Sequence, residues 1–316
     1  MKTGLTTMKK FSLFYFKYNA SICLLFFMGF SMTDLEQMLA SLERSRTMQQ
    51  ARGKNGNIDA DSNPLHDLTE NTVTKSHALS RAYYRLSLVE KRCMEALISK
   101  LHPLRTDNQL QHIELRATEY ANAFPDVGKH AYEQLATAGD ALVNRVITVE
   151  NPKEGIERDK LTLMARVRYQ PKQGKIICTF NPLVVPHLIG LREKFSSYPL
   201  KRAVDFQSSY TWRFYEILVS WSQPRQETRG LFAGWIKRQS VDELREMLGV
   251  PNSYKWDNFQ KQVLDVVIPE IREKANIAIF VERIKTGRKI THLNISFIED
   301  DQMKMELEGG KKSKKT

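Results

Sequence analysis

The chain has 316 residues and a formal net charge of +12 at pH 7. This length allows two domains of ordinary size, and the charge favours a polyanionic partner such as nucleic acid, because cations that neutralise phosphates release condensed counterions. The three cysteines, Cys23, Cys93 and Cys178, are widely spaced and form no Cys-x-x-Cys pair, which argues against a zinc site or a disulfide framework and suits a reducing cytoplasm.

The first 31 residues contain an apolar run that resembles a signal peptide and is densest at residues 22–30. Residues 17–19 (KYN) interrupt it, no small-x-small cleavage site follows, and the run is too short to span a membrane. We therefore expect residues 1–31 to be an upstream extension, with Met32 as a candidate true start. A membrane anchor is the alternative, and N-terminal mass analysis of the natively expressed protein separates the two.

Residues 32–78 are expected to form a short amphipathic helix and a flexible arm. Residues 51–76 are rich in Asn, Asp, Thr and Gly without periodicity, which is typical of a flexible segment. The helix should pack onto the body of the protein, with self-association as the alternative. Its apolar side chains recur at helical spacing, at Leu35, Met38, Leu39 and Leu42.

Residues 79–200 predict a first winged-helix domain, which is a helix-turn-helix followed by a β-hairpin. Ser87 and Glu90 match the capping-box pattern, in which a hydroxyl and a carboxylate satisfy free amides at a helix start. That helix should end near Pro103. The other elements are a strand at 113–116, a helix capped by Thr118 and ending at Pro125, a longer helix after Gly128, a hairpin of 161–169 with 175–180, and a closing helix at 182–191.

Residues 201–299 repeat this order of elements and predict a second winged-helix domain. Ser240 and Glu243 match another capping box. The elements are a helix at 208–221, a strand at 235–238, a helix from Val241 to Gly249, a helix from Trp256, and a hairpin of 277–284 with 290–298. The expected fold class is therefore α+β, with two tandem winged-helix domains and a basic, disordered tail at residues 300–316.

The helix that starts at Trp256 should have one packing face and one exposed face. Pro269 should bend or restart it, because proline lacks the amide hydrogen that the helix needs. The expected packing face consists of Phe259, Val263, Val266 and Val267, and the exposed face consists of Asn258, Lys261, Gln262 and Asp265.

A winged module reads DNA with this second helix in the major groove, while the hairpin loop reaches phosphates or the adjoining minor groove. Amide side chains suit adenine, and lysine suits guanine or a phosphate. The candidate residues of the second domain are Tyr254, Lys255, Asn258, Lys261 and Gln262 on the helix and Arg283, Lys285, Arg288 and Lys289 on the wing. The first-domain set is sparser, which predicts mainly phosphate contacts: Lys129, His130, Gln134, Lys172 and Lys175.

The sequence contains no pattern typical of catalysis. Its seven histidines include no His-x-His pair, no Gly-Lys-Ser/Thr phosphate loop is present, and the carboxylates lie mostly beside Lys or Arg. We therefore expect a protein that is not an enzyme, with no catalytic residues, no metal and no cofactor. Helical spacing favours a core role over single-strand stacking for the aromatic residues Trp212, Phe214, Tyr215 and Trp221.

These residues make the chain resemble the iteron-binding plasmid replication initiators, the Rep family that includes the RepA, RepE and π proteins. The resemblance covers about residues 80–298. It lies in the order and spacing of 194–198 (KFSSY), 208–218 (SSYTWRFYEIL), 259–271 (FQKQVLDVVIPEI) and the Gly-Arg-Lys hairpin at 287–289.

The resemblance implies that the second domain dominates recognition of directly repeated origin sites, with the DNA-reading role at residues 254–262 and the wing at 283–289. We expect the first domain to grip phosphates or to mediate dimerisation. It implies that monomers bind direct repeats of double-stranded DNA at an origin and help to open it. Dimers would bind an inverted repeat and repress the initiator's own gene. A host replication initiator and the replicative helicase would be further partners. Independently of the resemblance, we expect no membrane partner and, from the cysteine usage, a cytoplasmic location.

Two other functions remain open. The nearer one is a winged-helix transcriptional repressor without initiator activity, although tandem modules without an effector domain favour the initiator. A nicking enzyme or a primer-synthesising polymerase is disfavoured, since the sequence lacks paired histidines and closely set acidic metal ligands.

Overall fold

The computed structural model describes residues 67–101, 112–151, 156–222 and 232–299. The expected leader at residues 1–31, the amphipathic helix near Leu35 and the basic tail lie outside these ranges. None of the helices in these ranges has the length and apolar character that a membrane span requires.

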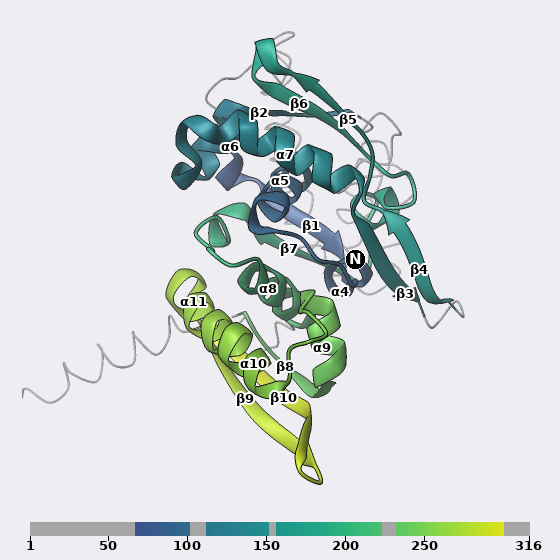
Figure 1. Cartoon of the computed structure of the whole chain (residues 1–316), viewed down its shortest axis with the longest axis vertical. Coiled ribbons are helices and arrows are strands. Elements are labelled where there is room, and N and C mark those ends of the chain that lie inside the picture. Colours follow the sequence, from purple (N-terminus) through teal and green to yellow (C-terminus); the bar gives the residue numbers. More distant parts are fainter. Residues whose placement is uncertain (1–66, 102–111, 152–155, 223–231, 300–316) are drawn as a thin grey trace, which may run out of the picture. The chain divides into compact units, whose positions relative to one another are not determined.

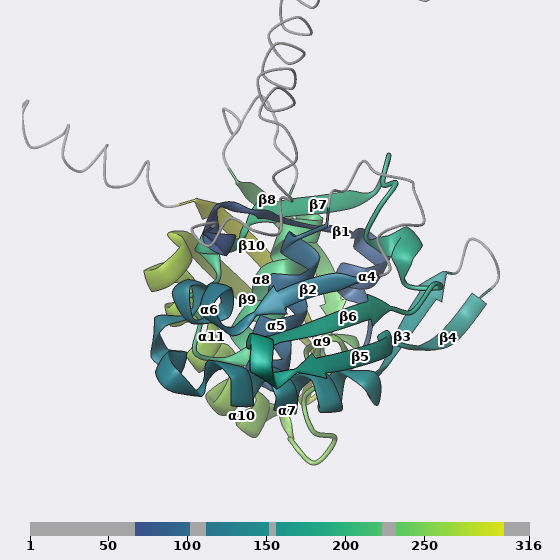
Figure 2. The same ribbon diagram turned by 90° about the horizontal axis from the view of Figure 1, so that it is seen from above.

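In the described part of the first domain, helices α5 (Leu88–Ser99), α6 (Ala117–Ala123) and α7 (Ala131–Val143) pack on a three-stranded sheet (Figures 1 and 2). The sheet consists of β2 (Ile113–Arg116), β6 (Lys175–Phe180) and β5 (Met164–Gln170), in that order. A Cβ added at Gly139 would be 3.0 Å from the side chain of Val167, so α7 lies close to the edge strand β5.

The second domain repeats this arrangement, with a sheet of β8 (Ala233–Ser240), β10 (Lys289–Glu299) and β9 (Ile277–Thr286), in that order. In each domain, the strand that precedes the helix-turn-helix, β2 or β8, pairs antiparallel with the second strand of the hairpin, β6 or β10. The helical elements are α8 (Ser209–Trp221), α9 (Val241–Leu248), α10 (Trp256–Phe259), a π-helical segment (Gln260–Leu264) and α11 (Asp265–Ala275). The expected tandem winged-helix fold is therefore confirmed.

Local sequence signals place the helix ends. Ser87 and Glu90 form both hydrogen bonds of the capping box at the start of α5. The Ser240 hydroxyl accepts from the amide of Glu243, and Gly249 ends α9 in the left-handed conformation with φ 68°. The expected cap at Thr118 is wrong, because α6 already starts at Ala117, directly after strand β2.

The first domain also contains β1 (Thr72–Ser76), α4 (His77–Arg81), β3 (Val146–Asn151) and β4 (Ile156–Thr162). Strand β1 pairs with β7 (Phe195–Pro199), and β3 pairs with β4. The expected flexible arm is therefore wrong for residues 67–76, where Val73 and Lys75 are buried. The β1–β7 pairing joins segments more than a hundred residues apart, so local composition does not reveal it.

Two expectations for the end of the first domain are also wrong. The run at residues 161–169 divides into β4 and β5 at Leu163, whose amide donates to the carbonyl of Arg145 instead. The closing helix at 182–191 is only a 3-10 turn at Val185–His187. Pro186 has no amide hydrogen to donate, and Gly190 adopts a left-handed φ of 68°, so neither residue supports a longer helix.

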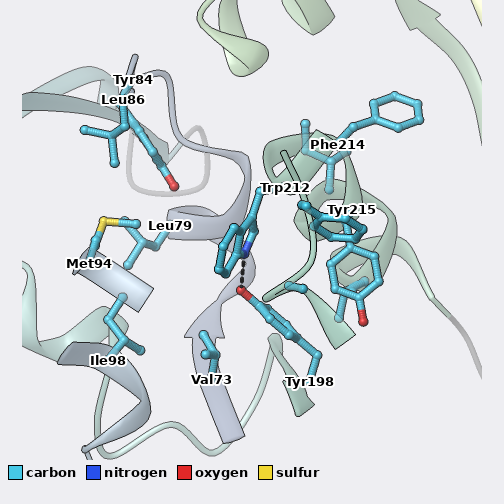
Figure 3. Packing of buried hydrophobic residues seen from close by; sticks show 14 of the residues in the cluster. Val73, Leu79, Tyr84, Leu86, Met94, Ile98, Tyr198, Trp212, Phe214 and Tyr215 are labelled. Atoms are coloured by element: carbon cyan, nitrogen blue, oxygen red, sulfur yellow. Dashed lines mark hydrogen bonds between the residues drawn. The ribbon is translucent and has the colours of Figure 1, made fainter. Parts of the chain in front are cut away.

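One continuous core holds the aromatic residues of α8. Trp212, Phe214 and Tyr215 are buried, which confirms the expected core role. The indole of Trp212 donates to the hydroxyl of Tyr198 at 3.0 Å (Figure 3). Trp221 is half-buried, and the Arg81 guanidinium lies 4.0 Å from its ring centroid.

Candidate nucleic-acid interface

The second domain presents a helix-turn-helix whose second helix begins at Trp256. Helix α9 ends at Gly249, residues 251–254 form the turn, and Arg245 stabilises that turn by donating to the carbonyls of Pro251 and Asn252. Of the predicted DNA-reading residues, Tyr254 is half-buried against the core. The others on this helix are exposed: Lys255, Asn258, Lys261 and Gln262.

A π-helical segment at Gln260–Leu264 changes the faces of this helix. A π turn holds one more residue than an α turn, so it shifts the positions that follow it around the helix axis. Phe259, Val263 and Val267 are buried as expected, but Val266 is 45% exposed. The assignment of Val266 to the packing face is therefore wrong, and the helix continues through Pro269.

The wing is a long hairpin with a short turn. Thr286 pairs with Lys289, so only Gly287 and Arg288 lie between the strands, and Lys285 and Lys289 belong to the strands themselves. Gly287 has a φ of 62°, which favours glycine. The four predicted cations of the wing are exposed: Arg283, Lys285, Arg288 and Lys289.

The helix and the wing meet at Trp256. The Arg283 guanidinium lies 5.7 Å from the Trp256 ring centroid, within the range of a cation–π contact. Trp256 also packs on Phe259 at 6.1 Å between centroids. The start of the helix and the wing therefore lie side by side at Trp256. We name the exposed candidates on both elements the DNA-reading surface, after the role predicted for them: Lys255, Asn258, Lys261, Gln262, Arg283, Lys285, Arg288 and Lys289. Sequence reasoning missed Trp256 as the link, although an aromatic residue at the first helical position was a visible signal.

The first-domain candidates differ in exposure and in their partners. Lys129 and His130 are exposed just before α7, and the His130 imidazole lies 2.9 Å from the carboxylate of Glu133. Gln134 is half-buried, and Lys172 is exposed at the tip of the β5–β6 hairpin. Lys175 is buried, and its ammonium group donates to Glu114 at 2.6 Å. A phosphate contact by Lys175 would therefore require separation of this ion pair.

Among the described residues, no group of three or more His, Cys, Asp or Glu side chains could hold a metal ion. Cys93 and Cys178 are buried free thiols. Burial raises the pKa of Cys178 to about 12 and raises that of Cys93 well above its usual value, so neither is a thiolate at neutral pH.

Comparisons with known proteins agree with this geometry. Among solved structures, the chain is similar to the Pi initiator protein in complex with iteron DNA, with 22% identity, a TM-score of 0.58, and coverage of 74% of this chain and 99% of that chain. It is also similar to the WH1 domain of MSBI1.176, a replication protein isolated from a multiple sclerosis patient. That match has 24% identity and covers 32% of this chain and 79% of the other, and its TM-score of 0.25 supports no conclusion.

The Pi match has too low an identity to show more than a shared fold. The family assignment comes from two family models that match consecutive parts of the chain. The model described as Initiator Replication protein, WH1, matches residues 72–219, and the model described as Initiator Rep protein, WH2, matches residues 240–297. The chain therefore belongs to the initiator replication protein family, with one winged-helix domain of each type.

Proposed function

We propose that this protein initiates plasmid replication by binding repeated sites, iterons, in double-stranded DNA at the plasmid origin. The proposal rests on the DNA-reading surface of this chain, which belongs to the initiator family. In this surface, the start of the second helix and a cationic wing lie side by side at Trp256. The Pi initiator protein, which has a similar fold, is described in complex with iteron DNA.

The second domain supplies sequence recognition in this proposal. Its helix enters the major groove, where Asn258 and Gln262 are suited to adenine edges and Lys261 to guanine. The wing cations neutralise phosphates, a contribution that does not depend on sequence.

The first domain grips the phosphates of the neighbouring helical turn through Lys129, His130 and Lys172. Two tandem modules that contact successive turns of one duplex cover roughly 20 base pairs, by the geometry of groove-binding domains. Repeats of about that length in the DNA that flanks the gene would support the proposal.

The later steps of initiation belong to the same proposal. Monomers bound to the direct repeats help to open the origin and recruit the host replication initiator and the replicative helicase. Dimers bind an inverted repeat and repress the gene of the initiator.

A plasmid test examines the proposal directly. The gene and its flanking DNA are joined to a selectable marker without another origin, and the plasmid is introduced into a host in which the parental plasmid is maintained. Stable replication is expected, together with its loss when Lys261 and Gln262 are both changed to Ala. A protein that binds the flanking repeats but supports no replication would instead be a transcriptional repressor, and one that binds no repeat would contradict the assignment of the reading surface.

A further inference from the structure

A cluster of charged side chains is buried where the two domains meet, and we name it the junction cluster. Three cationic and two anionic side chains form it, each at most 3% exposed. They come from two neighbouring elements of the first domain and from one element much later in the sequence: Lys75 of β1, Lys91 and Glu95 of α5, and Arg213 and Glu216 of α8.

Every charge in the junction cluster has a partner. The Lys91 ammonium group lies 2.7 Å from a carboxylate oxygen of Glu95 and 2.7 Å from one of Glu216. Lys75 also bonds to both carboxylates. The hydroxyl of Tyr198 lies 3.1 Å from each carboxylate and accepts the indole hydrogen of Trp212 (Figure 3). Such a cluster is stable only while its partners remain in place, because an unpaired buried charge costs several kcal/mol.

Arg213 connects the junction cluster to the backbone on both sides of the junction. Its Nη2 donates to the carbonyl of Ala82 at 2.9 Å and to the carbonyl of Met247 at 3.1 Å. Its Nη1 donates to the Tyr84 hydroxyl at 2.6 Å and to Glu216 at 2.8 Å. Ala82 follows α4 in the first domain, whereas Met247 lies in the last turn of α9. One guanidinium group therefore joins the backbone of the two domains.

The turn of the second helix-turn-helix rests on the same segment of the first domain. A Cβ added at Gly249 would lie 2.9 Å from the carbonyl oxygen of Tyr84 and 3.0 Å from the Cα of Arg85. This glycine lies between α9 and the helix that starts at Trp256. Because the approach is so close, the direction of the second helix is tied to the position of the segment at Tyr84.

We propose that Arg213 is a positioning residue, which sets the spacing and orientation of the two DNA-binding domains so that both engage one duplex site in a single register. The inference rests on the proposed function, because it requires both domains to contact DNA. The inference also assigns a role to the motif at residues 208–218, which contributes no residue to the DNA-reading surface.

The physical basis is the gain in affinity when two rigidly connected domains bind the same duplex. Once one domain is bound, a fixed junction presents the other at the correct groove, which raises its effective concentration without any new contact. Each base pair inserted between the two half-sites rotates and displaces one half-site, so a rigid pair of domains should reject altered spacing. A loose pair should tolerate it.

The test compares Arg213→Lys with the wild type in the full-length chain. Lysine keeps the charge of the junction cluster, but its single ammonium group cannot bridge two carbonyls, a hydroxyl and a carboxylate with the planar geometry of a guanidinium. Tyr84→Phe is a milder second variant, which removes one partner of Arg213 and keeps the ring. Arg192→Lys, at an exposed position, is the matched control.

Binding to three duplexes is measured by fluorescence anisotropy. The first is one repeat of the flanking DNA that the wild-type protein protects from nuclease cleavage, and the second is the same repeat with two base pairs inserted between its two halves. The third is only the half-site at which Lys261 and Gln262 determine the base preference. We expect Arg213→Lys to reduce affinity for the intact repeat roughly tenfold or more and to change affinity for the half-site little. The preference for native over altered spacing should fall toward one. Equal reductions on the intact repeat and the half-site, or an unchanged spacing preference, would overturn the inference.

A measurement without DNA separates this inference from the proposed function. Spin labels are placed at Thr137→Cys in α7 and Glu273→Cys in α11, both exposed, with Cys23 changed to Ser. The distance distribution between the labels should be narrow in the wild-type background and broader with Arg213→Lys. If the wild type binds no repeat, the proposed function fails while this measurement still tests the junction. An equally narrow distribution in the variant would contradict the positioning role.

Discussion

Single side chains of the recognition helix decide which DNA sequence is preferred in the proposed mode of binding. Replacing Lys261 and Gln262 with Ala should cost about 1–3 kcal/mol for each good base contact and relax the sequence preference. Competition gel shifts with specific and unrelated duplexes measure both effects. Glu273→Ala, on the exposed side of α11, is the control. An unchanged preference would remove the two residues from the reading surface.

The wing cations should raise the affinity for DNA without changing which DNA sequence is preferred. Changing Lys285 and Arg288 to Gln should weaken binding to all sequences and reduce the slope of log K against log salt by about 0.9 for each phosphate that is no longer neutralised. Binding titrations at several salt concentrations test this expectation. Lys274→Gln removes a positive charge elsewhere on the domain and should leave the slope unchanged. If the wing variant keeps the wild-type slope, the wing does not contact phosphates.

Exposure of single residues could be predicted from the sequence only where it depends on nearby residues. Exposure of Asn258, Lys261 and Gln262 follows from helical periodicity, which the sequence displays. Burial of Lys175 does not, because its partner Glu114 is 61 residues away on a neighbouring strand. A lysine in an alternating strand looks the same in the sequence whether a carboxylate lies beside it or water does.

At the scale of elements, the π-helical segment leads us to expect different contributions to stability from two adjacent valines. Val267 is fully buried and Val266 is 45% exposed. Val267→Ala should therefore lower the free energy of unfolding by about 1–3 kcal/mol, whereas Val266→Ala should change it by less than about 0.5 kcal/mol. Urea denaturation of the two variants provides the comparison, and each is the control for the other. Equal decreases would mean that the helix is a regular α-helix through this region.

Elements were predictable where their signals are local. Caps and left-handed glycines act within one turn, so the boundaries at Ser87, Ser240 and Gly249 could be read directly. Strand β1 could not be predicted, because it exists only through its pairing with β7. The π-helical segment was also invisible, since no local signal distinguishes it from an α turn of the same composition.

At the scale of the whole molecule, the junction cluster links stability to pH. Burial opposes the charged form of Glu216, but Lys75, Lys91 and Arg213 outweigh it and hold the pKa of Glu216 well below its usual value. A carboxyl group with a lowered pKa stabilises the folded state above its unfolded pKa of about 4.3, and this stabilisation disappears as the pH falls from that value through the folded pKa.

Glu216→Gln should therefore have two effects. The free energy of unfolding near pH 7 should fall by about 3–5 kcal/mol, because three buried cations would each be deprived of a carboxylate partner. The decline of stability below about pH 4.3 should become shallower than in the wild type. Urea denaturation from neutral to strongly acidic pH measures both. Glu273→Gln, at an exposed position, should show neither effect. If Glu216→Gln loses stability at acidic pH as steeply as the wild type does, the lowered pKa of Glu216 is not a source of the acid dependence.

The sequence by itself determined the repeat of element order, the α+β class and the polar face of the recognition helix. These follow from periodicity and capping, which act over a few residues. Only the tertiary structure decided which cations are buried, how the π-helical segment turns the helix, and how the two domains meet. Those features depend on pairs such as Lys75 with Glu216, which are 141 residues apart and close together only after folding. Their energies come from burial and from pairing of charges, and neither is encoded in any short stretch of the chain.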